Sequence, residues 1–235
     1  MALCLPAGAV QASTAELQGT WALEMHIVSA ASVPVIGDVR STTVTYSLME
    51  TVSGEDGWTQ HYSVCDVVLT GQTRLMRSSL SQAFIDALPE RSVHPVLNDG
   101  AYQVDLGEVS LGFDPGLSAG HTPQQASDPA VLDHEGDGAP GFTVKVDVWL
   151  MPTVAIYLTQ ANHTFLEGEL VSPDRVVGRP MVSRLEQHVI GASHSAFGRS
   201  PIVRPLNDEG SFQLVRVPTG TRCEDIQGLL ADGDP

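Results

Sequence analysis

The sequence predicts an all-β protein, an antiparallel meander of about eight to ten strands that closes into a β-barrel and carries one short helix. Short runs rich in β-branched and aromatic residues recur along the 235 residues, and turn signals separate them. A hydrophobic fraction of 42% allows a substantial buried core. A β-sandwich is the structural alternative, because it is built from the same kinds of strands and turns.

The first three strands are expected directly after Gly19. Their runs read GTWALEMHIV, VRSTTVTYSLMETV and WTQHYSVCDVVL. In the second run Val44, Tyr46 and Leu48 alternate with hydroxyl-bearing residues, which is the period-two pattern of a half-buried strand. Residues 53–57, SGEDG, supply the glycines of a hairpin turn. These runs therefore predict consecutive antiparallel strands.

One segment, residues 79–89, has the spacing of a helix. Leu80, Phe84 and Leu88 recur at helical intervals, and Pro89 ends the pattern. A serine at the start of the segment is a suitable cap. We therefore expect a single short helix here.

The second half of the chain begins with a long polar segment. Residues 114–141 are rich in glycine and proline and have no apolar periodicity, so they predict a loop insertion. Strand-like runs then return: FTVKVDVWL, TVAIYLTQ, HTFLEGELV, RPMVSRLEQHVIG and SFQLVRV. We expect one domain over residues 13–235 that contains this insertion.

The balance of charge excludes some partners. The formal net charge is −16, and the few basic residues are scattered along the chain. Such a protein repels phosphate backbones and anionic lipid surfaces. Nucleic acid is therefore not an expected partner.

The N-terminal residues indicate export. Residues 3–10 are short and apolar, and Val10-Gln11-Ala12 offers small residues at the usual cleavage positions, so residues 1–12 are expected to be the remnant of a signal peptide. A disordered apolar N-terminus is the alternative. No stretch reaches the roughly 18 apolar residues of a membrane helix. We expect a secreted or periplasmic protein without a membrane span.

Two cysteines remain outside this segment, Cys65 and Cys223. In an oxidising compartment such a pair is typically bridged, which would tie the C-terminal tail to an early strand. Two buried free thiols are the alternative.

The first and last strand runs carry a recognisable pair. Gly19-Thr20-Trp21 opens the first run, and Arg216 lies in the last, FQLVRV. This arrangement resembles lipocalins and related calycins, which implies that Arg216 stacks on the Trp21 indole at the closed end of a barrel, with the glycine allowing the close approach. The chain also resembles a group of exported bacterial proteins with no established activity, which implies no function.

The stretch DHEGDGAPG, residues 133–141, is the only short stretch with ion-binding chemistry. Asp133, Glu135 and Asp137 stand at alternate positions, as in a calcium loop, and the Ala139 carbonyl occupies a backbone-ligand position. Val144 replaces the closing glutamate of an EF-hand, so a looser Ca²⁺ loop is expected at most. A solvated acidic turn is the alternative.

No catalytic motif is present. Ser193 and Ser195 flank His194 in a predicted loop, and Glu167 and Glu169 share one face of a predicted strand, but neither group has the pattern of a known active site. A barrel enzyme acting on a hydrophobic small molecule has no residue signature here.

The expected function is therefore the binding of a small, mostly apolar ligand inside the barrel. A calcium-stabilised structural or adhesive surface protein is the alternative. Aromatic residues of the predicted strands are the candidate ligand-binding residues, and core packing explains each of them equally well. They are Tyr46, Trp58, Tyr62, Trp149 and Tyr157.

Overall fold

The computed structural model describes residues 17–33, 37–55, 57–70 and 76–232. The predicted signal remnant, residues 1–12, lies outside the described residues. Strands dominate the described part, so the prediction of an all-β protein is confirmed. No helix in this part is long and apolar enough to cross a membrane.

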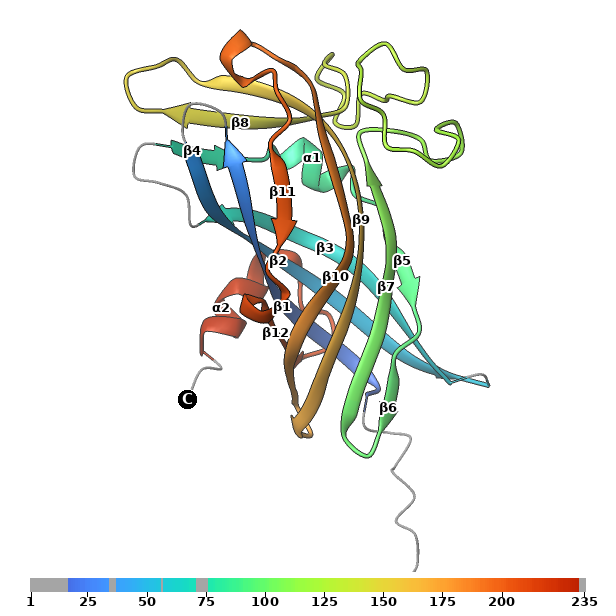
Figure 1. The fold of residues 1–235 in the computed structure, drawn as a ribbon. Coiled ribbons are helices and arrows are strands. Elements are labelled where there is room, and N and C mark those ends of the chain that lie inside the picture. Colours follow the sequence, from blue (N-terminus) through green and yellow to red (C-terminus); the bar gives the residue numbers. More distant parts are fainter. Residues whose placement is uncertain (1–16, 34–36, 56, 71–75, 233–235) are drawn as a thin grey trace, which may run out of the picture.

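Twelve strands form a single sheet in the described part of the chain (Figure 1). They are β1 Gly19–Val33, β2 Gly37–Gly54, β3 Gly57–Thr70, β4 Met76–Ser79, β5 Arg91–Val93, β6 Val96–Asn98, β7 Ala101–Leu111, β8 Phe142–Val148, β9 Val154–Ser172, β10 Arg175–Ala192, β11 Ile202–Pro205 and β12 Ser211–Val217. The short helices are α1 Gln82–Asp86 and α2 Ile226–Asp232, with 3-10 turns η1 Ser195–Phe197, η2 Asn207–Glu209 and η3 Cys223–Asp225.

The sheet is antiparallel, with the strand order β4-β8-β9-β10-β12-β1-β2-β3-β5. Strand β7 pairs with β9, next to β8, and also pairs with β6. Strand β11 pairs with the C-terminal part of β1, which β12 does not reach. The longest pairings join neighbours in the sequence, β1 with β2, β2 with β3, and β9 with β10. The predicted meander is therefore confirmed.

The predicted closure into a barrel is not found in the described part of the chain, and the strand count exceeds the eight to ten expected. The hydrogen-bonded order ends at β4 on one side and at β5 on the other, so the sheet is open. At the seam, β5 is only three residues long, and Pro95, which has no N–H to donate, follows soon after it. A side chain spans part of the gap instead, because Arg91 Nη1 donates to the Leu106 carbonyl of β7 at 2.8 Å.

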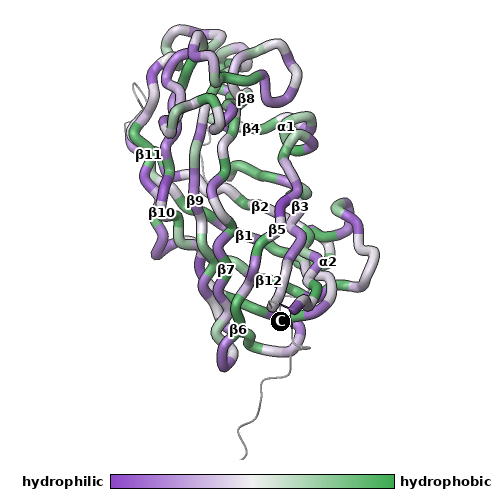
Figure 2. The backbone as a smooth tube through the Cα atoms, turned by 90° about the vertical axis from the view of Figure 1, so that its right-hand side faces the viewer, coloured by the Kyte–Doolittle hydropathy of each residue, from purple (hydrophilic) through white to green (hydrophobic). Residues whose placement is uncertain are grey.

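Polar and apolar residues alternate along the strands, as the hydropathy of the backbone in Figure 2 shows. The inward-facing side chains of one half of the sheet form a close-packed core. Trp21, Leu23, Met49, Tyr102 and Leu166 are all fully buried there. This packed half is called the narrow end below.

Arg216 covers Trp21 at the narrow end, so the structure brings together the two residues that the lipocalin resemblance paired. The guanidinium carbon lies 4.3 Å from the centroid of the indole ring. Trp21 Nε1 donates to the Leu17 carbonyl at 2.8 Å, and Arg216 Nε donates to Asp174 at 2.8 Å. Arg216 also donates to the Gln18 carbonyl. The contact therefore links the first strand, the last strand and the turn between β9 and β10.

The predicted disulfide is confirmed: Cys65 of β3 is bonded to Cys223 of η3. The bond closes a loop with a sequence separation of 158, which stabilises by about 5 kcal/mol in the chain-entropy model. It holds α2 against the outer face of the sheet, where Ile226 and Leu230 pack on Ala22.

The helix predicted over residues 79–89 is confirmed as α1. Ser81 caps its start, since its hydroxyl accepts from the Phe84 amide at 3.0 Å. Phe84 and Ile85 are buried against Phe142 of β8. Helix α2 is a second helix that the sequence analysis did not predict.

Replacing Gly19 with alanine should destabilise the narrow end. Gly19 has a φ of +124°, and a Cβ there would meet Arg216 Nη1 at 3.0 Å. Gly57 is a matched control, because its φ is +115° and a Cβ would meet nothing within 4 Å. Both alanines strain the backbone, but Gly19→Ala should lower the free energy of unfolding by about 1 kcal/mol more, because it also displaces the guanidinium. Urea unfolding followed by circular dichroism measures the difference, and equal losses would contradict the role given to this contact.

Candidate functional site, an interior cavity

A cavity of about 390 Å³ lies inside the curved sheet, beyond the packed narrow end. Its walls come from strands on both sides of the open seam, β1 to β5 and β7 to β11, and from the segment around α1. Most of the lining side chains are apolar. The volume falls within the roughly 300–1,000 Å³ typical of small-molecule sites.

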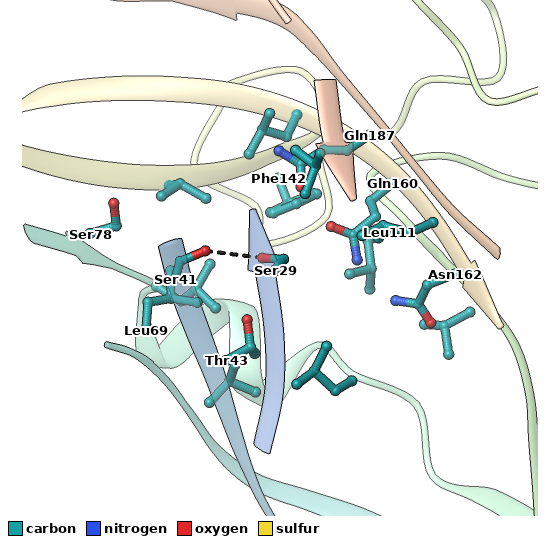
Figure 3. Close-up of a pocket in the computed structure, with 18 of the residues that line it drawn as sticks. Ser29, Ser41, Thr43, Leu69, Ser78, Leu111, Phe142, Gln160, Asn162 and Gln187 are labelled. Atoms are coloured by element: carbon teal, nitrogen blue, oxygen red, sulfur yellow. Dashed lines mark hydrogen bonds between the residues drawn. The ribbon is translucent and has the colours of Figure 1, made fainter. Parts of the chain in front are cut away.

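One wall carries hydroxyl groups from β1 and β2. The register of the two strands places Ser29 opposite Ser41 and Ile27 opposite Thr43, and all four side chains line the cavity. The two serine hydroxyls are hydrogen-bonded to each other at 3.1 Å (Figure 3). This pairing leaves a mildly polar surface between apolar neighbours.

The wall formed by β9 and β10 carries amide groups. Gln160 and Asn162 of β9 and Gln187 of β10 line the cavity, and Gln160 stands directly opposite Gln187 in the ladder (Figure 3). No hydrogen bond joins any of these side-chain amides to another residue in the described part of the chain. They therefore offer donors and acceptors to the interior.

Charged groups in the lining are few and positive. Among the described residues the lining includes Arg91 and Arg199 and no carboxylate, although the whole chain carries 28 acidic residues. Arg91 lies over the ring of Tyr62, at 5.2 Å from the centroid. Arg199 is exposed near η1. The charge of the described lining therefore disfavours cations relative to neutral or anionic molecules.

Of the five predicted ligand-binding aromatics, Tyr62 lines the cavity and the other four do not. Trp58 packs half-buried against the narrow-end core, Tyr46 lies on the outer face beside α2, and Tyr157 faces outward onto Gly191 of β10. Trp149 is 68% exposed. Strand parity explains Tyr46 and Tyr157, which alternate with the inward-facing residues of their strands. Trp58 shares the inward parity of Tyr62 but lies in the packed narrow end, and Trp149 lies past the end of β8.

The sequence analysis missed the amide group as a candidate site. A signal for it was present, since Ile156, Leu158, Gln160 and Asn162 follow one another at every second position. Two amides that continue an inward-facing apolar series mark a polar site inside a core.

The acidic loop uses its carboxylates on its own backbone. Asp133 accepts from the amides of Gly136, Asp137 and Gly138 at 2.8–3.1 Å. Asp137 accepts from the Ala139 amide and from the Thr143 hydroxyl, both at 2.8 Å. These are the contacts of a tight turn.

Glu135 completes the loop by binding both flanking elements. It accepts from the Thr143 amide at 3.2 Å and from the Ser81 hydroxyl at 3.4 Å. Burial, and then the nearby Asp137 and Asp133, raise the pKa of its carboxyl above the usual value. Among the described residues, no group of three or more His, Cys, Asp or Glu side chains is placed to hold a metal ion. Calcium binding at Asp133, Glu135, Asp137 and Ala139 stays a prediction.

The insertion over residues 114–141 packs on the outer face of the wall that carries the amides. Thr122 donates to Glu186 of β10 at 2.8 Å, and Thr159 of β9 donates to the Pro123 carbonyl at 2.6 Å. In Figure 1 the insertion lies beside the upper parts of β9 and β7. It therefore supports the strands whose inner face lines the cavity.

The remaining polar motifs have structural contacts. Ser193 accepts from the Ala155 amide at 2.9 Å, and His194 accepts from the Ala196 amide at 3.3 Å. Glu167 and Glu169 lie on the outer face of the sheet, in a second hollow that Glu24 and Arg175 also line. None of these residues lines the interior cavity.

No protein-family model, no curated protein and no solved structure matches the chain. The resemblance to lipocalins therefore stays a prediction, and what the structure shows is an antiparallel all-β sheet in which Arg216 lies over Trp21.

A calcium ion in the acidic loop would raise thermal stability. With millimolar CaCl₂ the melting midpoint of the wild type should exceed the midpoint in chelator, since weak extracellular sites have dissociation constants of about 10⁻⁴ to 10⁻³ M. Asp133→Ala should melt lower than the wild type even in chelator, because it removes three acceptor contacts. A wild-type midpoint that calcium leaves unchanged removes the site and leaves an acidic turn.

Proposed function

We propose that the protein binds a small, mostly apolar molecule in the interior cavity, as a binding protein of the exported type. The observation that carries the proposal is the combination of an apolar cavity of about 390 Å³ with amide groups that have no partner among the described residues. A packed scaffold needs neither feature. Unpaired polar groups in an apolar site are costly, and a ligand or water that pairs them removes the cost.

A glutamine outside the cavity makes the contrast clear. Gln60, at the narrow end, is 0% exposed, and both ends of its amide are paired. It donates to the Thr51 hydroxyl at 2.9 Å and accepts from the Tyr102 hydroxyl at 2.9 Å. The fold thus pairs a buried amide where nothing else can reach it. Gln160 and Gln187, which are half-buried and line the cavity, have no such partner in the described part of the chain.

The lining also narrows the ligand class. A ligand with an apolar body and one uncharged hydrogen-bonding group, such as a hydroxyl or a carbonyl, matches the apolar walls and the amides of Gln160, Asn162 and Gln187. The two arginines and the missing carboxylates of the described lining disfavour a cationic group. The disulfide between Cys65 and Cys223 supports an oxidising compartment as the site of action.

Filling the cavity should weaken binding. Thr43 lines the cavity, whereas its neighbour Thr42 on β2 does not. Thr43→Phe should weaken binding of the neutral apolar probe N-phenyl-1-naphthylamine by about tenfold or more, and Thr42→Phe, the same change on the outer face, should leave it unchanged. Probe fluorescence gives both constants. A wild type that does not bind the probe, or an equal loss in both variants, would refute interior binding.

The amide group should select for a polar head. 1-Octanol and octane share an apolar chain, so the ratio of their affinities, measured by displacement of the probe, isolates the hydroxyl. Gln160→Leu should lower this ratio by about fivefold, the equivalent of one hydrogen bond. Gln103→Leu on the exposed face of β7 is the control and should leave the ratio unchanged. An unchanged ratio in Gln160→Leu would show that the amides do not recognise the ligand.

A further inference from the structure

The turn between β8 and β9 exposes three consecutive apolar side chains. Trp149 is 68% exposed, Leu150 83% and Met151 37%. The other exposed large apolar residues of the described part stand singly in the sequence. Single exposed apolar residues are ordinary, but a contiguous group at the tip of a hairpin marks a contact surface. These three residues are called the apolar tip below.

The backbone of the tip is held in a conformation that presents these side chains outward. Leu150 has a φ of +66°, a region that glycine or asparagine normally occupies and that costs a leucine about 1 kcal/mol or more. The Met151 amide donates to the Val148 carbonyl at 3.0 Å, and the Thr153 hydroxyl donates to Asp147 at 2.5 Å. Because Leu150 is both strained and exposed, a glycine at this position would suit the fold at least as well.

The apolar tip joins two strands, β8 and β9, that both line the cavity. Val146 of β8, three residues before Trp149, lines the cavity, and so does Met76 of β4, which stands opposite Val148. In Figure 1 this hairpin projects from the upper left of the molecule, at the opposite end from the turn that joins β9 to β10. An exposed apolar surface and an apolar interior therefore meet on one hairpin.

The size and chemistry of the tip fit a lipid surface better than a protein partner. Three side chains are far fewer than the roughly 20–30 residues per side of a stable protein interface. Tryptophan favours the boundary between lipid headgroups and hydrocarbon, and leucine and methionine favour the hydrocarbon. Residues 148–153, VWLMPT, carry no charge. The net charge of −16 excludes a strongly anionic membrane and leaves a zwitterionic one.

We propose that the apolar tip inserts reversibly into a zwitterionic lipid surface and so places the mouth of the cavity against the lipid from which the ligand enters or to which it is released. The transfer of a ligand through the lipid rests on the proposed function. The insertion itself rests on the observed exposure of the tip. Insertion is shallow, because three side chains bury only a small area. Attachment is therefore weak and readily reversed.

Flotation with phosphatidylcholine vesicles tests the insertion. The wild type should float with the vesicles, and Leu150→Gly should bind them about tenfold more weakly, because it removes the most exposed side chain. The same variant should melt at an equal or higher temperature than the wild type, because glycine relieves the positive φ. Weaker binding with undiminished stability is a combination that damage to the fold does not produce. Vesicle binding that Leu150→Gly leaves unchanged, or a wild type that does not float, would overturn the proposal.

A matched control uses the turn at the other end of the sheet. Val171, near the turn that joins β9 to β10, is 55% exposed, and Val171→Gly should leave vesicle binding unchanged. The wild-type tryptophan emission should shift to the blue on vesicle addition, and Trp149→Phe should lose that shift. An equal loss in Val171→Gly would overturn the assignment to the tip. So would self-association in the absence of lipid that Leu150→Gly abolishes, since the tip would then bind a second copy.

The two proposals fail separately. Probe binding without vesicles reports the cavity alone, and Leu150→Gly should leave it unchanged. Thr43→Phe should lose the probe but keep vesicle flotation. A protein that floats without binding the probe contradicts the proposed function and leaves membrane insertion standing, and the converse result contradicts the insertion alone.

Discussion

The stacking of Arg216 on Trp21 fixes where the interior of this protein is packed and where it is hollow. It joins the first strand to the last and draws in the turn between β9 and β10, so the strands converge at this end. Fully buried side chains such as Met49 and Tyr102 then fill the space between them. The strands diverge beyond this point, and side chains of ordinary size no longer reach across the interior. The cavity follows from convergence at one end only.

β-Bulges produce the divergence. Register shifts interrupt the ladders at Tyr46/Ser47 between β2 and β3, at Asp105/Glu108 in β7, and at Val182/Arg184 in β10. Each bulge bends its strand and increases the twist, which lets one sheet curve around a common interior without closing. The open seam between β5 and β7 lies beside the bulge of β7, where Arg91 contacts the Leu106 carbonyl.

The bulges also explain which parts of the structure could be predicted from the sequence. Strand runs, the α1 helix and the cysteine pair follow from local patterns and compartment chemistry, and they were predicted. Which residues of a strand face inward does not follow from local sequence patterns alone. In β3 the inward parity changes from Tyr62 and Val64 to Val67 and Leu69, because Cys65 is the extra residue that has no partner in the ladder with β2. Aromatic residues chosen by type alone therefore fell mostly outside the cavity.

A similar parity change places one of the three cavity amides that sequence reasoning missed, whereas Gln160 and Asn162 follow the unbroken inward series of β9. In β10 the inward series passes from Val182 to Leu185 and Gln187, so Gln187 faces the cavity only because of the bulge between them. The exposed tip was missed for a different reason. Trp149 ends a run that has the pattern of a buried strand, and only its position past the last ladder pair, Met76 with Val148, leaves it in solvent.

Strand β9 runs from the apolar tip to the narrow end, and the polarity of its inward-facing residues changes along the way. From the apolar tip inward, its cavity-facing residues are Ile156 and Leu158, then Gln160, Asn162 and Thr164, and Leu166 follows in the packed narrow end. A ligand that pairs with the amides therefore holds its polar group deep in the cavity and its apolar body toward the mouth. If the mouth of the cavity lies against lipid, the apolar body of the ligand passes directly between the lipid and the apolar part of the cavity. Its exposure to water on the way is then small. A ligand that held its polar group at the rim would place that group against the lipid. An apolar tip would then not assist its transfer.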